Sequence, residues 1–287
     1  MVKHNLIYGI FYGAVLLVLL AMPFAFGEDV STSVAIGNSP PVVGTVTSSD
    51  DFAPPTCGNV TAWCNATITD ANGYNDIKIA NATLWDPAST TIDGSDDNST
   101  HYVTRCFLNG GSGSAINANC SFAIVYHANP AEWTCRIYAN DTSSNVHNNS
   151  KTDVTIITLR ALDANNTISF GTLSPGTSST ADANNTILNC GNVPTDLNLS
   201  GTDLTNATAS VTNISVGNVK YNITTPDQQY TTSMTSLSAT STYTNFTLTK
   251  RTSGLSLNNT YWKIGIPASI ENLVFTGTIT FTAVPDT

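Results

Sequence analysis

Runs of alternating apolar and polar residues dominate this chain and decide what it can fold into. Between residues 275 and 283 the odd positions are nearly all apolar, and the even positions are all threonine. The same alternation recurs at residues 219–224 and 245–249. Successive side chains of a β-strand point to opposite faces, so each run predicts a strand with one buried and one solvated face. No stretch after residue 27 has the spacing of an amphipathic helix, and we therefore expect an all-β fold.

The predicted strands fall into two groups, which indicates two tandem β-sandwich domains. We expect the first domain at residues 40–162 and a second antiparallel sandwich at residues 163–287. Predicted strands of the first domain are 42–48, 59–69, 76–85, 101–108, 119–127, 132–139 and 152–160. Those of the second are 166–172, 184–190, 195–200, 208–224, 229–235, 243–250, 260–266 and 274–284.

The first 27 residues have the pattern of an export signal. Lys3 precedes an uncharged, mostly apolar run at residues 5–27, and Ala25-Phe26-Gly27 matches the small-x-small pattern of a cleavage site. We expect residues 1–27 to form a signal helix that is removed, which leaves an arm at residues 28–39. The alternative is an uncleaved anchor, because about 20 apolar residues also span a bilayer. Either way, the remaining chain is expected outside the cell, at its surface.

Composition agrees with export and argues against nucleic acid as a partner. The net charge is −10 and only 10 % of residues are charged, whereas phosphate binding needs clustered Lys and Arg. Fifteen Asn-x-Ser/Thr sequons occur, more than chance pairing predicts, and sequons accept glycans on exposed chain outside the cytosol. We expect glycans at fourteen of them: Asn59, Asn65, Asn81, Asn98, Asn140, Asn148, Asn165, Asn184, Asn198, Asn206, Asn213, Asn222, Asn245 and Asn258.

All six cysteines follow the predicted signal, as expected for disulfides that form in an oxidising compartment. Cys106 and Cys120 flank the Gly-rich segment 109–113, a predicted hairpin tip. Adjacent strands would bring these two sulfurs together, so we predict that they are bonded. Cys57 and Cys190 can either bridge the two domains or remain thiols.

The residues around Cys135 resemble a known strand. The segment Trp133-Thr134-Cys135-Arg136-Ile137-Tyr138 resembles the second-cysteine strand of immunoglobulin-like domains. Cys64 lies on the apolar face of an early predicted strand. The resemblance implies an inter-sheet disulfide between Cys64 and Cys135, with Trp85 on a strand between them. Where that family carries the tyrosine of its tyrosine corner, this chain carries Trp133.

The second domain has a resemblance of its own. Four of its segments resemble, in order and in sequence, secreted prokaryotic β-sandwich domains of the TasA and camelysin type. They are equally similar to modules of archaeal surface proteins. The segments are 168–176, 186–192, 261–267 and 275–281. The resemblance implies fibres in which each subunit lends a terminal strand to the next. In this chain the arm would be lent, since Val30, Val34 and Ile36 share one face. The alternative is that the arm is simply a first strand or a flexible leader.

One loop can hold a cation. Asp70, Asn72 and Asp76 surround Gly73 and offer the hard oxygen ligands that calcium prefers. The alternative is an Asx-type turn between two strands. We expect no other cofactor and no enzyme, because no histidine after the signal lies in a nucleophile motif and no carboxylate pair is recognisable.

Together these features predict a non-enzymatic extracellular structural protein. It would associate with itself, or with other cell-surface proteins, through its sheet edges. The alternative is a surface adhesin or receptor that binds a glycan or protein with loops at the sandwich ends. The aromatics Trp63 and Tyr138 would then stack on sugars. Contact with a membrane is expected only through residues 5–27, if they are not cleaved.

Overall fold

The structure is a computed structural model that describes residues 27–49, 51–208 and 213–286. The described residues form strands and two single 3₁₀ turns, so the fold is all-β, as expected. The predicted signal helix lies outside the described residues, apart from its last residue. No helix in the described part of the chain has the length and apolar character needed to cross a membrane.

Two five-stranded sheets build the first domain. One sheet has the order β1-β4-β8-β7, and β2 also pairs with β4. Its strands are β1 (Val42–Val43), β2 (Thr47–Ser48), β4 (Asn59–Thr69), β7 (Phe107–Ser112) and β8 (Ala115–Val125). The other sheet has the order β3-β10-β9-β5-β6. Its strands are β3 (Asp51–Phe52), β5 (Ile77–Trp85), β6 (His101–Arg105), β9 (Glu132–Asp141) and β10 (Val146–Ile156). All pairs are antiparallel except β10 with β3. One sheet contains the order β4-β8-β7 and the other contains the order β10-β9-β5. This is the strand order of an immunoglobulin-like sandwich.

The alternation of apolar and polar residues in the sequence matches the alternation of buried and exposed side chains in this domain. Along β4 the odd residues from Thr61 to Thr67 are exposed or half-buried, whereas the even residues from Ala62 to Ile68 are buried. Cys64 belongs to the buried set and forms a disulfide with Cys135 of β9. This bond joins the two sheets through the core, as the resemblance implied.

Trp133 fills the centre of the same core. It is fully buried, its ring packs against Tyr102, and its indole N–H donates a 3.0 Å hydrogen bond to the backbone carbonyl of Asn129. The tyrosine corner of immunoglobulin-like domains also bonds a backbone group a few residues upstream. The tryptophan therefore keeps the type of hydrogen bond for which the family uses tyrosine. Trp85 is buried as well, and the Arg136 guanidinium lies 5.6 Å from its ring centroid.

The chain changes sheets at Cys106. The expected single strand 101–108 is in fact two strands, since β6 pairs with β5 in one sheet and β7 pairs with β8 in the other. Between them the Cys106 N–H donates to the Ala80 carbonyl, and its sulfur forms a disulfide with Cys120 of β8. A buried residue therefore fixes the crossing point.

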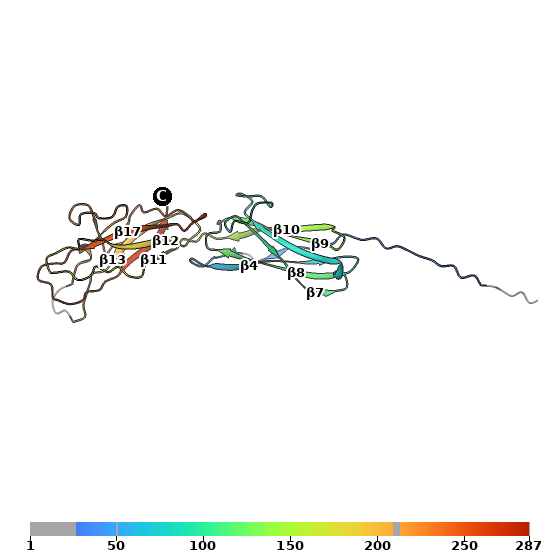
Figure 1. Ribbon diagram of the computed structural model, residues 1–287, viewed down its shortest axis with the longest axis horizontal. Coiled ribbons are helices and arrows are strands. Elements are labelled where there is room, and N and C mark those ends of the chain that lie inside the picture. The colour runs from blue at the N-terminus through green and yellow to red at the C-terminus, as the bar shows by residue number, and fades with distance from the viewer. Residues whose placement is uncertain (1–26, 50, 209–212, 287) are drawn as a thin grey trace, which may run out of the picture. The chain divides into compact units, whose positions relative to one another are not determined.

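The second domain also consists of two sheets. One has the order β11-β12-β17-β14-β15, formed by β11 (Leu162–Ala164), β12 (Ala183–Asn189), β17 (Leu257–Ile264), β14 (Val219–Asn222) and β15 (Thr235–Ser236). The other has the order β16-β13-β18, formed by β16 (Thr242–Tyr243), β13 (Thr195–Gly201) and β18 (Ile279–Pro285). Leu197, Leu199 and Trp262 are fully buried between them. Figure 1 shows the labelled strands of each domain.

Several predicted strands of the second domain are shorter or absent. Of the predicted strand 229–235 only Thr235 lies in a strand, of 243–250 only Tyr243 does, and the predicted strand 274–284 begins only at Ile279. Residues 166–172 form no strand, although Ile168 and Phe170 still pack against the core. Gly171 has a φ of 69°, which lies outside extended geometry and interrupts the run. Among the described residues of the predicted strand 208–224, which are 208 and 213–224, only β14 forms a ladder, because the 3₁₀ turn η2 (Val216–Asn218) precedes it. After it, the Asn222 side chain accepts N–H bonds from Thr224 and Thr225 and turns the chain.

Each domain has its own core, and the two are covalently joined twice. Buried apolar residues of the first core lie between Val43 and Ile156, and those of the second between Ile187 and Ile264. The peptide chain continues from β10 into β11. A disulfide between Cys57 and Cys190 forms the second link, so the bridge left open by the sequence is present.

Candidate functional site

Three carboxylates gather at one end of the first sandwich. Asp70 follows β4, Asp76 closes the 3₁₀ turn η1 (Tyr74–Asp76), and Asp141 is the last residue of β9. One carboxylate oxygen from each lies within 4.8 Å of the other two. Asp70 is 2 % exposed and Asp141 is 0 % exposed. We call Asp70, Asp76 and Asp141 the carboxylate cluster.

The turn from Asp70 to Asp76 positions two members of this cluster. The Asp70 side chain accepts a 2.8 Å hydrogen bond from the Asn72 N–H, which makes an Asx turn. Gly73 follows with a φ of 109°, a conformation that favours glycine, and its carbonyl accepts the Asp76 N–H. The Tyr74 N–H donates to the Gly113 carbonyl of the neighbouring hairpin. The expected Asx turn is therefore present and holds Asp70 and Asp76 close together.

Two oxygens of the cluster lack hydrogen bonds. Oδ2 of Asp70 and Oδ2 of Asp76 are both buried, and neither has a hydrogen-bond partner among the described residues. The other oxygen of Asp76 accepts the Thr142 hydroxyl. Buried polar atoms are nearly always paired, so two unpaired carboxylate oxygens in one cluster call for an explanation.

Asp141 is the most strongly bonded member. Its carboxylate accepts the backbone N–H of Asn145 and the side-chain N–H groups of Asn145 and Asn38. Burial raises the pKa of Asp141, but these hydrogen bonds, with another from the Ser143 backbone, outweigh burial and hold the pKa below its usual value. The carboxylate is therefore ionised at neutral pH.

The sequence predicted part of this cluster. Asp70 and Asp76 lie together as expected, whereas the oxygen of Asn72 accepts the Ser39 N–H at 2.7 Å. Asp141 was missed because it lies on a distant strand, and only the pairing of β5 with β9 brings it near. Through Asn38 and Ser39, the base of the arm is hydrogen-bonded to the residues of this turn and cluster.

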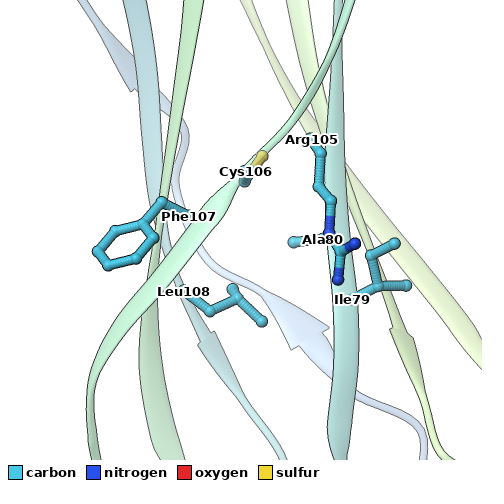
Figure 2. Close-up of a pocket in the computed structure, with 6 residues that line it drawn as sticks. All are labelled: Ile79, Ala80, Arg105, Cys106, Phe107 and Leu108. Atoms are coloured by element: carbon cyan, nitrogen blue, oxygen red, sulfur yellow. The ribbon is translucent and has the colours of Figure 1, made fainter.

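A second feature is a groove at the open edge of the same domain. It has a volume of about 400 Å³ and is lined by Ile79, Ala80, Arg105, Cys106, Phe107 and Leu108. The groove opens where the chain crosses between sheets, because β5 pairs with β6 only from Asn81 to Trp85. Leu108 points into this space and Phe107 points away from it (Figure 2).

The strands beside this groove are edge strands. β6 ends one sheet and β7 ends the other, so each has one side without a neighbour in the described ladders. Phe107 of β7 is 69 % exposed and Val103 of β6 is also exposed. Unpaired strand edges with apolar side chains are templates for pairing with another chain.

The sequon asparagines lie at the surface. None of the fifteen is buried, and all of them are exposed or half-buried. Strands β4, β5, β8, β9 and β10 each carry at least one, whereas β6 and β7 carry none. The two edge strands at the groove are therefore the longer strands of this domain without an acceptor site.

A buried histidine lies near the junction of the domains. His127 packs edge-on against Tyr126, and its Nδ1 lies 3.3 Å from the Ser99 hydroxyl. Burial lowers the pKa of His127, and the positive charges of Arg251 and Lys250 lower it further. Arg251 donates a hydrogen bond to the Tyr126 hydroxyl, so cations of the second domain reach this part of the first.

The two aromatics considered for sugar stacking differ in accessibility. Trp63 is exposed on the outer face of β4. Tyr138 is half-buried, and its hydroxyl accepts the side-chain N–H of the sequon residue Asn81 at 2.8 Å. Only Trp63 therefore presents an open ring face.

Comparison with known proteins assigns no family. No protein-family model matches the chain. No curated protein matches it either. Among solved structures the chain is similar to dimeric latent PorU from Porphyromonas gingivalis, with 14 % identity and a TM-score of 0.27 over 86 % of this chain and 20 % of that one. It is also similar to the C-terminal domain of the AgI/II polypeptide BspA of Streptococcus agalactiae, with 11 % identity and a TM-score of 0.23. This match covers 85 % of this chain and 96 % of that one. The chain thus spans about a fifth of the PorU chain. The resemblance to TasA and camelysin domains stays a prediction.

Proposed function

We propose that this chain is a non-enzymatic structural protein of the cell surface that assembles by strand addition at the edge formed by β6 and β7. Its three disulfides suit an oxidising environment outside the cell. The observation that carries the proposal is the pattern of acceptor sites. Every longer strand of the first domain bears a sequon except the two that border the apolar groove.

Glycans explain why this pattern matters. A glycan is bulky and keeps other protein surfaces away from the chain that bears it. At the expected sites, four strands of the first domain would be shielded in this way, and β6 and β7 have no acceptor site of their own. Because Phe107 and Val103 are exposed on these edges, an incoming strand gains both ladder hydrogen bonds and apolar contacts.

The incoming strand in this proposal is the arm of a second copy. Val30, Val34 and Ile36 are 82 %, 85 % and 86 % exposed, so the arm has apolar side chains free to be buried. Glu28 and Asp29 begin the arm, and Arg105 lines the groove, so their charges are complementary. An extended segment of this kind suits β-augmentation of an open edge.

Assembly of the chain beginning at Glu28 tests this proposal. We expect filaments or large oligomers by electron microscopy and sedimentation, and monomers after deletion of residues 28–37 or after Phe107→Asp. Val146→Asp is the matched control, because Val146 is an exposed valine outside the groove and its loss should leave assembly intact. Unchanged assembly of Phe107→Asp would contradict the proposed edge. A monomer that binds a glycan array, and loses that signal in Trp63→Ala, would instead support the adhesin alternative.

A further inference from the structure

We propose that Asp70, Asp76 and Asp141 form a calcium site that ties together the two sheets of the first domain. This proposal does not depend on the proposed assembly. Two independent observations carry it: the buried charge of the carboxylate cluster and the unpartnered oxygens within it.

No cationic side chain of the described residues forms a salt bridge with the carboxylate cluster. Asp70 and Asp141 are almost completely buried. In the described part of the chain, the one salt bridge joins Lys263 to Asp182 in the other domain. Burial of ionised carboxylates without a counter-charge is costly, and proteins meet that cost by pairing the charges or binding a metal. A divalent cation would offset the charge of all three groups.

The unpartnered oxygens mark where ligands are available. Oδ2 of Asp70 belongs to a side chain that is 98 % buried, since 2 % of it is exposed, and it lacks a hydrogen bond in the described structure. Asp76 is half-buried as a residue, but its Oδ2 atom is buried and likewise lacks a hydrogen bond among the described residues. A bound cation would satisfy both oxygens at once, whereas a plain Asx turn explains only Oδ1 of Asp70.

The donor set favours calcium among divalent cations. All three groups offer hard oxygen atoms, and the oxygens that converge lie within 4.8 Å of one another. Calcium binds oxygen at 2.3–2.6 Å, so two ligands of one ion lie up to about 4.6–5.2 Å apart. Magnesium demands shorter bonds and near-ideal octahedral geometry, to which two carboxylates of one turn and a third from a strand end adapt less readily.

The position of the site gives it a structural role. Asp70 extends from β4 of one sheet, and Asp141 ends β9 of the other. A cation held between them would link the sheets at the end of the sandwich where Asn38 is bonded to Asp141. Calcium would therefore order the 70–76 turn and the base of the arm together.

Titration calorimetry on the chain beginning at Glu28, stripped of metal with a chelator, tests the proposal. We expect calcium to bind at one saturable site and to raise the melting temperature as its concentration increases. Magnesium should bind at least tenfold more weakly. Absence of binding at millimolar calcium, or magnesium binding of equal affinity, would overturn the assignment.

Variants locate the binding on the cluster. Asp70→Asn should weaken calcium binding at least tenfold and remove the calcium-dependent rise in melting temperature, because it removes a charge with little change in shape. Asp93→Asn is the matched control, since Asp93 is an exposed aspartate outside the cluster, and it should bind as the wild type does. A metal-free melting temperature of Asp70→Asn at or above that of the wild type shows that the variant is folded. Wild-type affinity in Asp70→Asn would place the metal elsewhere and reject this site.

Discussion

The indole N–H of Trp133 bonds the backbone carbonyl of Asn129, four residues upstream, at 3.0 Å. This bond fixes the chain at the start of β9, next to the disulfide that joins the two sheets. A fully buried tryptophan thus contributes both apolar volume and a hydrogen bond.

Trp133→Phe should separate these two contributions. The phenyl ring retains much of the apolar contact, but the Asn129 carbonyl loses its donor and a small cavity remains. We expect a loss of about 1–3 kcal/mol in the free energy of unfolding, measured by urea denaturation. Trp133→Ala should cost about 3–5 kcal/mol. Equal losses for the two variants would mean that the ring volume contributes little.

The Cys57–Cys190 disulfide should hold the domains together after the linker is cut. Arg160 is exposed between β10 and β11, so limited trypsin digestion is expected to cleave there. Two fragments should migrate as one band on a non-reducing gel and separate after reduction. The double variant Cys57→Ala with Cys190→Ala should separate without reduction. A wild-type digest that separates without a reductant would contradict the bond.

Acid should weaken the fold through His127. Burial, together with Arg251 and Lys250, sets its folded pKa below the unfolded value of about 6.5, although Asp97 opposes this shift. The unfolded state then binds more protons in the window below pH 6.5, so the free energy of unfolding falls as the pH drops through it.

His127→Gln isolates this effect. The difference in unfolding free energy between wild type and variant, measured by urea denaturation from pH 7 to pH 4, should shift in favour of the variant as the pH falls. A difference that stays constant with pH would show that His127 does not titrate differently on folding.

Gly111 is required by the approach of Tyr74. A Cβ atom at position 111 would lie 2.3 Å from the Tyr74 ring, far closer than atoms can pack. Gly111→Ala should therefore cost about 1–3 kcal/mol of stability and loosen the turn that carries Asp76. Gly254→Ala, where a Cβ meets open space, is the control. Thermal unfolding of both variants checks the prediction, and equal melting temperatures would contradict it.

Local patterns predicted the features that depend on neighbouring residues. Alternation from Val60 to Ile68 placed Cys64 in the core, and the Gly-rich tip between Cys106 and Cys120 predicted their bond. Both follow from the two-residue period of a strand and the geometry of a hairpin. The same reasoning located the Asx turn at Asp70.

Features that depend on distant pairing were not predictable in this way. The sequence gives no local sign that the chain changes sheets at Cys106, because both halves of the run 101–108 remain extended. Asp141 joins the cluster only through the register of β5 with β9. Gly171 shows that a local pattern can also mislead. The apolar pattern favoured a strand at residues 166–172, but the positive φ of Gly171 interrupts it.

The two covalent connections between the domains have a mechanical consequence. Bodies joined by a single peptide can spin about it, but a second tether at a different point resists rotation. A chain joined both through residues 157–161 and through Cys57–Cys190 therefore transmits torque from one sandwich to the next. Reducing that disulfide would remove one of the two covalent restraints on twisting without breaking the polypeptide.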